Sequence, residues 1–330
     1  MDKSVARNET LSLDAVPDPR TETLAEAVIA PMLPGDDMAC GVFRDDGSFC
    51  QISRTLISAN RFTATCARPE PQARLPGRHL FAGVGRHHFG HFLLECVSRL
   101  WASEDADYDG LVIIPKRDID FEAVFRRRFA PFLDLLTGGL PVYLVRRPLQ
   151  VETLVVPTQG IGHLRWSQGT ERFRRFARSR VAERIMPNGP DLLYVSRRQL
   201  KREEQMVDQE ERIEALMTQS GYEVFHPQKH SLEEQSARYR AASHIVGADG
   251  SAFHLAPFAI SVGTTLGLIQ RRNRPEIVSA LTSQIRAFCD VDLVTINALA
   301  NRRESDLRDK THAPIDFDLL KKQLEDTGLI

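Results

Sequence analysis

The 330-residue chain lacks several features that would define its class at once. It has no apolar run of the ~18 residues needed to span a bilayer. Its N-terminal segment, MDKSVARNETLSLDAVPDPR, lacks the apolar core of a secretory signal peptide. Its five cysteines form no CxxC pair, which is typical of a reducing compartment. We therefore expect a cytoplasmic protein and leave open a peripheral association with the cytoplasmic face of the inner membrane.

An excess of either charge is also missing. The formal net charge of −1 predicts no strong attraction to nucleic acid. Lysine is scarce, so arginine supplies most of the 43 basic residues, and the arginine fork suits phosphate groups. The composition, 42% hydrophobic and 26% charged, is that of a globular protein long enough for one large domain or two ordinary ones.

Short apolar strands alternate with helices of about a dozen residues, which predicts βαβ units and an α/β fold with a parallel sheet. The sequence PNGP marks the best boundary. We expect four parts: a polar lead-in (1–35), an N-terminal α/β domain (36–187), a C-terminal Rossmann-like domain (188–290) and a tail with an amphipathic helix (291–330).

The expected elements follow this division. Strands are predicted at 80–85, 111–115, 141–147, 151–157, 191–196, 222–227, 244–248 and 264–270. Helices are predicted at 88–102, 121–136, 170–185, 209–221, 231–242, 251–259 and 315–324.

The stretch HHFGHFLLECVSRLWA (87–102) carries the first candidate site. At about 100° per residue, its apolar residues occupy one half of a helix. The other half holds His91, Glu95, Ser98 and Arg99. One interpretation is a surface stripe in which Glu95 and Arg99 form an exposed ion pair. The other is a site, because the helix follows a glycine-bounded strand end, where open α/β sheets place their ligands.

A metal site competes for the same residues, since His87, His91 and Glu95 are spaced at i, i+4 and i+8. However, the chain has no HExxH motif, and Gly90 interrupts the helical register of His87. We therefore predict no metal, and keep as an alternative a metal-dependent hydrolase that uses the cluster of His87, His88 and His91.

The stretch DLLYVSRRQLKR (191–202) carries the second candidate site. Its apolar strand ends at Ser196, followed by Arg197 and Arg198. Hydroxyl and guanidinium groups at the carboxyl end of a strand suit a phosphate or diphosphate. The alternative is an ordinary basic loop.

A third element, HIVGADGSAFHLAPF (244–258), reads as strand, glycine turn and helix. Gly247 and Gly250 permit a tight turn and a close backbone approach. Ser251 or Asp249 can cap the helix, whose N-terminus favours an anion. Because Asp249 is itself negative, we expect it to meet hydroxyls or a base. The pattern is neither a Walker loop nor GxGxxG.

Taken in order, five segments resemble glycosyltransferase family 61, a group that includes bacterial capsular-polysaccharide transferases. They are GHFLLECVSRLW (90–101), YVSRR (194–198), QE (209–210), GYEVFHP with SLEEQ (221–235) and VGADGSAFHLAPFA (246–259). The resemblance implies a GT-B-like fold: two Rossmann-like halves with a cleft between them, the N-terminal half on the acceptor side and the C-terminal half binding a nucleotide-sugar. It also implies an inverting enzyme that needs neither metal nor cofactor, with a glycan or lipid-linked glycan as acceptor.

The resemblance also implies residue roles. His91 and Glu95 become the catalytic candidates, one of which takes the proton of the acceptor hydroxyl. The implied donor-binding and phosphate-binding residues are Arg99, Ser196, Arg197, Arg198, Glu210, Gly247, Asp249, Gly250, Ser251 and His254.

The chain departs from the family pattern at Gln209, Asp249 and Leu255. The family usually has Asn at the first position, His or Glu at the second, and Asn at the third. These departures keep a second alternative open, a catalytically silent nucleotide-sugar-binding or scaffold subunit.

Overall fold

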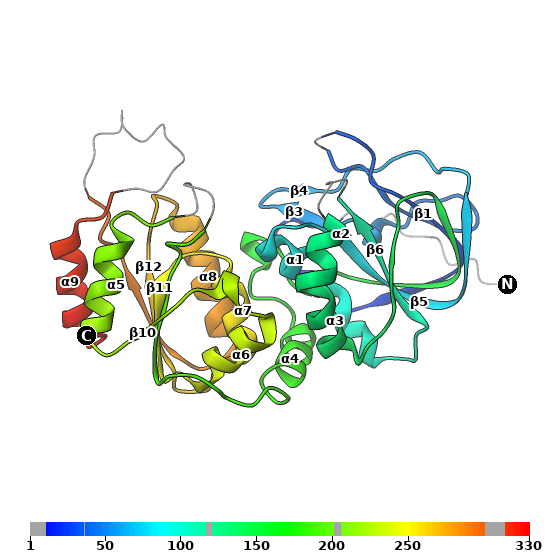
Figure 1. The fold of residues 1–330 in the computed structure, drawn as a ribbon. Coiled ribbons are helices and arrows are strands. Elements are labelled where there is room, and N and C mark those ends of the chain that lie inside the picture. Colours follow the sequence, from blue (N-terminus) through cyan, green and yellow to red (C-terminus); the bar gives the residue numbers. More distant parts are fainter. Residues whose placement is uncertain (1–10, 36, 117–120, 201–205, 301–313) are drawn as a thin grey trace. The chain divides into compact units, whose positions relative to one another are not determined.

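A computed structural model describes residues 11–35, 37–116, 121–200, 206–300 and 314–330. The chain divides into two compact units between Phe173 and Arg174, and each unit contains its own sheet (Figure 1). The division falls inside helix α4 (Glu171–Arg180), ahead of the PNGP segment at which we expected the boundary.

The first unit is built on a six-stranded sheet with the strand order β2-β1-β8-β5-β6-β7. Its strands are β1 (Thr21–Ala30), β2 (Gly41–Phe43), β5 (Ala73–Gly85), β6 (Gly110–Pro115), β7 (Val142–Leu144) and β8 (Leu149–Pro157). Strands β8, β5, β6 and β7 run parallel to one another, whereas β1 pairs antiparallel with both β8 and β2. A small ribbon joins β3 (Leu56–Ser58) and β4 (Arg61–Phe62).

The helices of this unit are short. They are α1 (Phe89–Glu95), a 3₁₀ segment (Val97–Glu104), α2 (Phe121–Val124), a π-helical turn (Phe125–Phe129) and α3 (Ala130–Thr137). The helix predicted over 88–102 is therefore an α-helix of two turns continued by 3₁₀ geometry. Single 3₁₀ turns lie at Gln51–Ser53 and Leu164–Trp166.

Strand β1 was not predicted from the sequence. Its segment TETLAEAVIA begins with polar residues and lies in the part expected to be a loose lead-in. The strand nevertheless pairs with β8 along most of its length, and Ala27 and Ile29 are fully buried in the core with Phe81 and Leu154. Burial against neighbouring strands stabilises this strand more than its own pattern does. Residues 1–10 of the expected lead-in lie outside the described residues.

The second unit contains a five-stranded, fully parallel sheet with the order β10-β9-β11-β12-β13. The strands are β9 (Leu192–Val195), β10 (Glu223–Phe225), β11 (His244–Ala248), β12 (Thr265–Ile269) and β13 (Asp292–Ile296). The helices are α5 (Glu210–Gln219), α6 (Leu232–Ala241), α7 (Ala252–Ala259), α8 (Pro275–Phe288) and α9 (Phe317–Asp326), with a 3₁₀ turn at Pro227–Lys229.

Numbered along the chain, these strands have the doubly wound order 2-1-3-4-5. In this topology a ligand binds where the order reverses, outside the carboxyl ends of the first and third strands. Those strands are β9 and β11, which are direct neighbours in the sheet.

The predicted α/β fold with a parallel sheet is confirmed, and seven predicted elements of the second unit, from 191–196 to 264–270, are present. Helix α8 and strand β13 were missed, and β13 lies in the segment expected to be a tail. The predicted C-terminal amphipathic helix is α9, which buries Leu320 and Leu324 against the core residues Tyr194 and Val246. Residues 301–313 of that tail lie outside the described residues.

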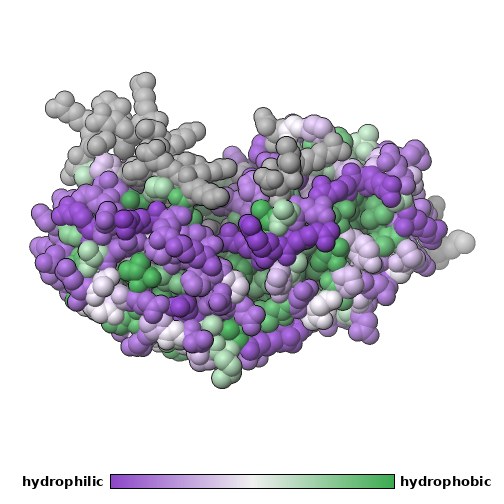
Figure 2. Space-filling model, in the orientation of Figure 1, coloured by the Kyte–Doolittle hydropathy of each residue, from purple (hydrophilic) through white to green (hydrophobic). Residues whose placement is uncertain are grey.

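Hydrophilic residues cover most of the face shown in Figure 2, with smaller hydrophobic areas between them. Among the described residues, we find no helix with the length and apolarity needed to cross a membrane.

Candidate active site

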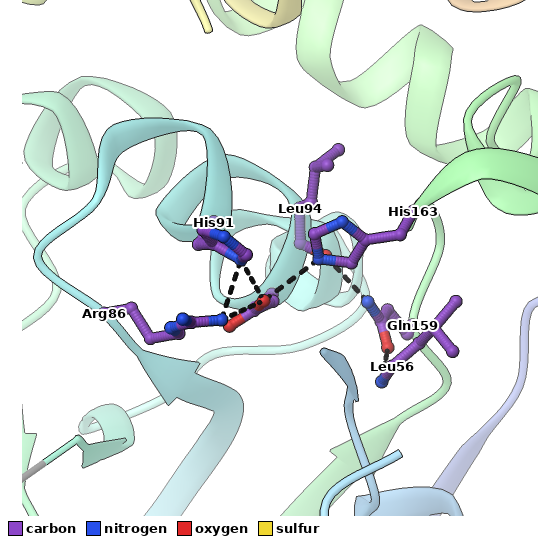
Figure 3. Close-up of polar contacts among 7 residues, drawn as sticks. Leu56, Arg86, His91, Leu94, Gln159 and His163 are labelled. Carbon is purple, nitrogen blue, oxygen red and sulfur yellow. Dashed lines mark hydrogen bonds and ion pairs between the residues drawn. The ribbon is translucent and has the colours of Figure 1, made fainter. Parts of the chain in front are cut away.

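The first cluster of polar side chains forms at the carboxyl edge of the sheet in the first unit. Arg86 directly follows β5, and α1 begins three residues later. Strand β8 runs parallel beside β5, so the segment that follows β8 and carries His163 leaves the sheet at the same edge. This topology explains why residues far apart in the chain converge there (Figure 3).

One carboxylate oxygen organises the cluster. Glu95 Oε1 lies 2.6 Å from His91 Nδ1, 3.0 Å from His163 Nε2 and 3.2 Å from Arg86 Nη1. Arg86 Nη1 also lies 2.9 Å from His91 Nδ1. The second oxygen, Glu95 Oε2, is buried without a hydrogen-bond partner. Glu95 is therefore the centre of a compact hydrogen-bonded array.

A glycine lets the end of α1 lie directly on β5. Gly83 has φ +80°, and a Cβ atom there would lie 2.6 Å from the carbonyl oxygen of Glu95. The β5–β6 register shifts between Phe81 and Val84, at the same point. A side chain at Gly83 would meet both the strain of the left-handed conformation and a steric overlap, so this residue sets how closely Glu95 approaches the strand.

Two buried side chains fix the surrounding loops. Gln159 donates to the carbonyl of Leu94 at 2.7 Å and accepts from the amide of Leu56 at 2.8 Å, which ties the β8 exit to α1 and β3 (Figure 3). Arg99 donates to the carbonyls of Ile52 at 3.0 Å, Arg54 at 2.7 Å and Pro157.

Arg99 was assigned to donor binding from the sequence, and the structure gives its side chain a different environment. The guanidinium is completely buried and is engaged by main-chain carbonyls. Burial lowers its pKa to about 10. We therefore leave Arg99 out of the proposed donor site and treat it as a residue that positions the loops.

The expected polar stripe is not a solvated surface. Glu95, Ser98 and Arg99 are all fully buried, and Glu95 and Arg99 make separate contacts in place of the exposed ion pair considered above. The spacing of 100° per residue predicted correctly which side chains share a face of the helix. It could not predict that other segments of the chain cover that face.

Exposure distinguishes the possible proton acceptors. The side chain of Glu95 is 0% exposed, whereas those of His91 and His163 are 27% and 16% exposed. A separation of 2.6 Å between a carboxylate oxygen and Nδ1 requires a proton between them, so the neutral His91 ring presents Nε2 as its acceptor. Of His91 and Glu95, only His91 offers an accessible basic atom.

The pKa values favour the same assignment. Burial lowers the pKa of His91 below its ordinary value, so the ring is neutral at pH 7. Burial raises the pKa of Glu95, but the hydrogen bonds from His163 and His91 outweigh it and bring the net pKa below the usual value. A neutral histidine beside an ionised carboxylate is the state in which the histidine can take a proton.

Among the described residues, His91, Glu95 and His163 are also the group able to hold a metal ion. This set differs from the predicted alternative of His87, His88 and His91. A tetrahedral zinc ion at about 2.0–2.1 Å from its ligands holds them about 3.3 Å apart. Here the donor atoms lie at hydrogen-bond separations, and the Arg86 guanidinium contacts two of them. The positive charge of Arg86 would oppose a cation at this position.

A second cluster forms at the carboxyl edge of the sheet in the other unit. Arg197 follows β9, Asp249 follows β11, and Arg271 and Arg272 follow β12. Because these three strands are adjacent and parallel, their exits lie side by side, at the reversal of strand order.

Asp249 is almost completely buried and holds the arginines in place. Its Oδ2 accepts from the amide of Arg271 at 3.1 Å, and its Oδ1 lies 3.3 Å from Arg271 Nε and 3.5 Å from Arg272 Nε. The expectation that Asp249 meets hydroxyls or a base is untested, but its immediate neighbours are guanidinium groups.

Gly247 and Gly250 allow the last residue of β9 and the residues that follow it to lie directly against the backbone of the β11 segment. A Cβ at Gly247 would lie 2.8 Å from the carbonyl oxygen of Val195, and one at Gly250 would overlap the guanidinium of Arg197. Neither residue has a positive φ, so the predicted tight turn does not rest on a left-handed conformation. Ser251 stands at the N-cap of α7, but its side chain makes no capping hydrogen bond.

Glu210 lies under the β9 exit. Its Oε1 accepts from the Arg197 amide at 2.7 Å and from the Tyr194 hydroxyl at 3.3 Å, while its Oε2 is buried without a hydrogen-bond partner. The residue before it, Gln209, is left-handed with φ +53°. Burial raises the pKa of Glu210 to about 7.

The remaining predicted donor residues lie nearby but have other contacts. Ser196 donates to Glu214 at 2.7 Å, and Arg198 forms ion pairs with Glu214 and Glu211. His254 Nδ1 lies 2.7 Å from the buried Gln284 on α8. The structure therefore brings Arg197, Asp249 and Glu210 together, with Arg198 directed to α5.

Three arginines gather around Asp249 in the second cluster. Arg197, Arg271 and Arg272 all lie near the Asp249 carboxylate, and burial raises the pKa of the neighbouring Glu210 to about 7. Burial, followed by the nearby charge of Arg197, lowers the pKa of Arg271 to about 10. Arg272 Nε is buried without a hydrogen bond, so a donor is available.

The raised pKa of Glu210 predicts a pH-dependent stability. Its folded pKa of about 7 lies above the ordinary value of 4.5, so its contribution to stability is fully present below pH 4.5 and is lost as the pH rises through 7. This difference corresponds to about 3 kcal/mol. We expect the Glu210→Gln variant to lose less stability than the wild type between pH 5 and pH 8, as measured by thermal unfolding. Parallel pH curves for the two proteins would contradict this prediction.

Sequence reasoning missed Arg86, His163, Arg271 and Arg272. Each had a weak signal, because each lies within a few residues of the carboxyl end of a predicted strand. His163 follows the predicted strand 151–157 in the glycine-rich segment TQGIGH, and the two arginines follow TTLGLIQ. What the sequence could not supply was the strand order that makes these exits neighbours.

Parallel strands in both sheets, with polar clusters at their carboxyl edges, are features of a Rossmann-like α/β protein. A model of the family described as Glycosyltransferase 61 matches residues 89–265, more than half of the chain. The chain therefore belongs to glycosyltransferase family 61 and is a glycosyltransferase. No curated protein matches it. The matched segment contains His91, Glu95 and His163, and it ends just before Arg271 and Arg272.

Proposed function

We propose that the chain is an inverting, metal-independent glycosyltransferase. It transfers a sugar from a nucleotide-sugar to a hydroxyl of a glycan or glycolipid in polysaccharide synthesis of the capsular type, at the cytoplasmic face of the membrane. The two units act as the two halves of a GT-B enzyme, with the donor bound by the second unit. The observation that carries this proposal is the group of three arginines at the reversal of strand order.

The arginines supply the electrophilic assistance that such a reaction needs. The leaving diphosphate gains negative charge as its bond to the sugar breaks, and preorganised cations lower the energy of that state. Asp249 pairs with Arg271 and Arg272, and Arg197 and Arg271 are buried, so the group needs little rearrangement to meet this charge. The unpartnered Glu210 Oε2 is available to a ribose hydroxyl.

His91 supplies the base. Single displacement with inversion requires a group that removes the proton of the acceptor hydroxyl as the oxygen attacks. His91 Nε2 takes this proton, and Glu95 acts behind it as a positioning residue that fixes the tautomer and stabilises the imidazolium formed. Metal independence is supported by the Arg86 guanidinium, whose charge occupies the cluster that a metal would need.

The proposal is tested by a thermal-shift screen of UDP-, GDP- and CMP-sugars, followed by donor turnover with and without EDTA. We expect one nucleotide class to raise the melting temperature, and turnover to be unchanged by EDTA. Binding without any turnover would favour the silent scaffold subunit. Loss of turnover in EDTA with recovery on zinc would favour the metal-dependent alternative.

A further inference from the structure

A third feature lies in the first unit and takes no part in either cluster. It is a pocket of about 570 Å³ lined by the start of β5, the strand β7 and the π-helical turn. Its charged lining consists of Arg74, Arg126, Arg146 and Arg147 together with Glu122. The lining residues therefore carry three more positive than negative charges, although one of them, Arg74, is already paired with Glu26 at 2.7 Å.

The contacts within the pocket show that these guanidinium groups bind a carboxylate. Glu122 Oε1 lies 2.8 Å from Arg126 Nη2, and Oε2 lies 2.9 Å from Arg146 Nη2. One carboxylate thus bridges two arginines and has its pKa lowered, chiefly by the hydrogen bond from Arg126. Because the side chains of Arg126 and Arg146 are 76% and 48% exposed, each keeps N–H donors available to a ligand.

The rest of the lining is hydrocarbon and aromatic. Leu75, Tyr143 and Leu149 line the pocket beside the arginines. A free phosphate ion would gain nothing from such residues, whereas a sugar acid combines an anionic group with the apolar faces of its ring. The pocket volume lies in the range of small-ligand sites. A π-helical turn, which supplies Arg126, is also a feature that recurs at functional sites.

We propose that this pocket binds a carboxylate-bearing sugar of an acidic acceptor glycan, remote from the bond that is formed. The proposal rests on the proposed function, because it assigns the pocket to the acceptor. Binding of a remote part of a substrate can hold the reacting part in place. Arg146 and Arg147, at the exit of β7, hold the carboxylate.

The test is a calorimetric titration of the full chain with a tetramer of uronic acid residues, without any donor. We expect saturable binding that weakens as salt is added. The double variant Arg146→Ala/Arg147→Ala should weaken this binding at least tenfold. The matched control is Arg127→Ala, because Arg127 is an exposed arginine of the same π-helical turn that does not line the pocket. This control should bind as the wild type does.

Each arm of the experiment decides the proposal. Failure of the tetramer to bind, equal binding of an uncharged glucose tetramer, or an equal loss in Arg127→Ala would overturn it. So would pocket-dependent binding of inorganic phosphate or of phosphatidylglycerol vesicles in place of the uronate. A melting curve checks that each variant folds. If the double variant does not fold, the single variant Arg147→Ala is compared with the wild type instead. Since no donor is present, a chain that fails to bind nucleotide-sugars can still bind the uronate, which separates the two proposals.

Discussion

Replacing His91 with alanine is expected to lower the rate of sugar transfer by about 10²–10⁴-fold, the range for loss of a general base. The physical reason is that His91 Nε2 is the accessible basic atom of the first cluster, whereas Glu95 is fully buried behind it. The measurement is kcat from donor turnover with a saturating acceptor. The matched control is His87→Ala, which removes an exposed histidine outside the array and should leave kcat unchanged.

The role of Glu95 is tested by a pH profile. The pKa of His91 lies below its ordinary value, and the hydrogen bond that His91 donates to Glu95 holds it higher than burial alone would. Glu95→Gln should therefore lower the plateau rate and also move the acidic limb of the profile to lower pH. A purely structural role for Glu95 would lower the amount of folded enzyme and leave that limb in place. If His163→Ala abolishes transfer while His91→Ala does not, the base is His163.

Replacing Arg272 with alanine is expected to weaken donor binding by about 10–150-fold. This factor corresponds to the ~1.5–3 kcal/mol of a hydrogen bond to a charged group. Arg272 is the better test than Arg271, because Asp249 keeps its amide and side-chain contacts with Arg271 when Arg272 is removed. The measurement is the Kd of the nucleotide diphosphate by calorimetry.

Two further variants decide whether the effect is specific. Arg274→Ala removes an exposed arginine two residues away that pairs with Glu276, and it should leave the Kd unchanged. Arg272→Lys keeps the charge without the planar fork and should recover part of the affinity. Equal losses of affinity in Arg272→Ala and Arg274→Ala would mean that the donor is held by nonspecific positive charge and not by a specific diphosphate site.

Local patterns in the sequence located both edges at which the clusters form. The strand endings at Gly85, Val195 and Ala248 were predictable from short apolar runs followed by glycine or polar residues. The carboxyl ends of parallel strands meet at one edge of a sheet, so His91 and Arg197 could be placed at site edges without coordinates. The doubly wound second unit was similarly predictable from its alternating pattern.

The sequence by itself thus determined the α/β class, the strand exits and the chemical types of several residues at them. Only the tertiary structure decided which exits are neighbours, and therefore that His163 joins His91 and Glu95 and that Arg271 and Arg272 join Arg197. It also decided that both Arg99 and Glu95 are buried. Burial removed Arg99 from the proposed donor site and made Glu95 a positioning residue. The reason is physical: periodicity reports which side chains share a face of one element, whereas burial and pairing depend on what non-local segments pack against that face.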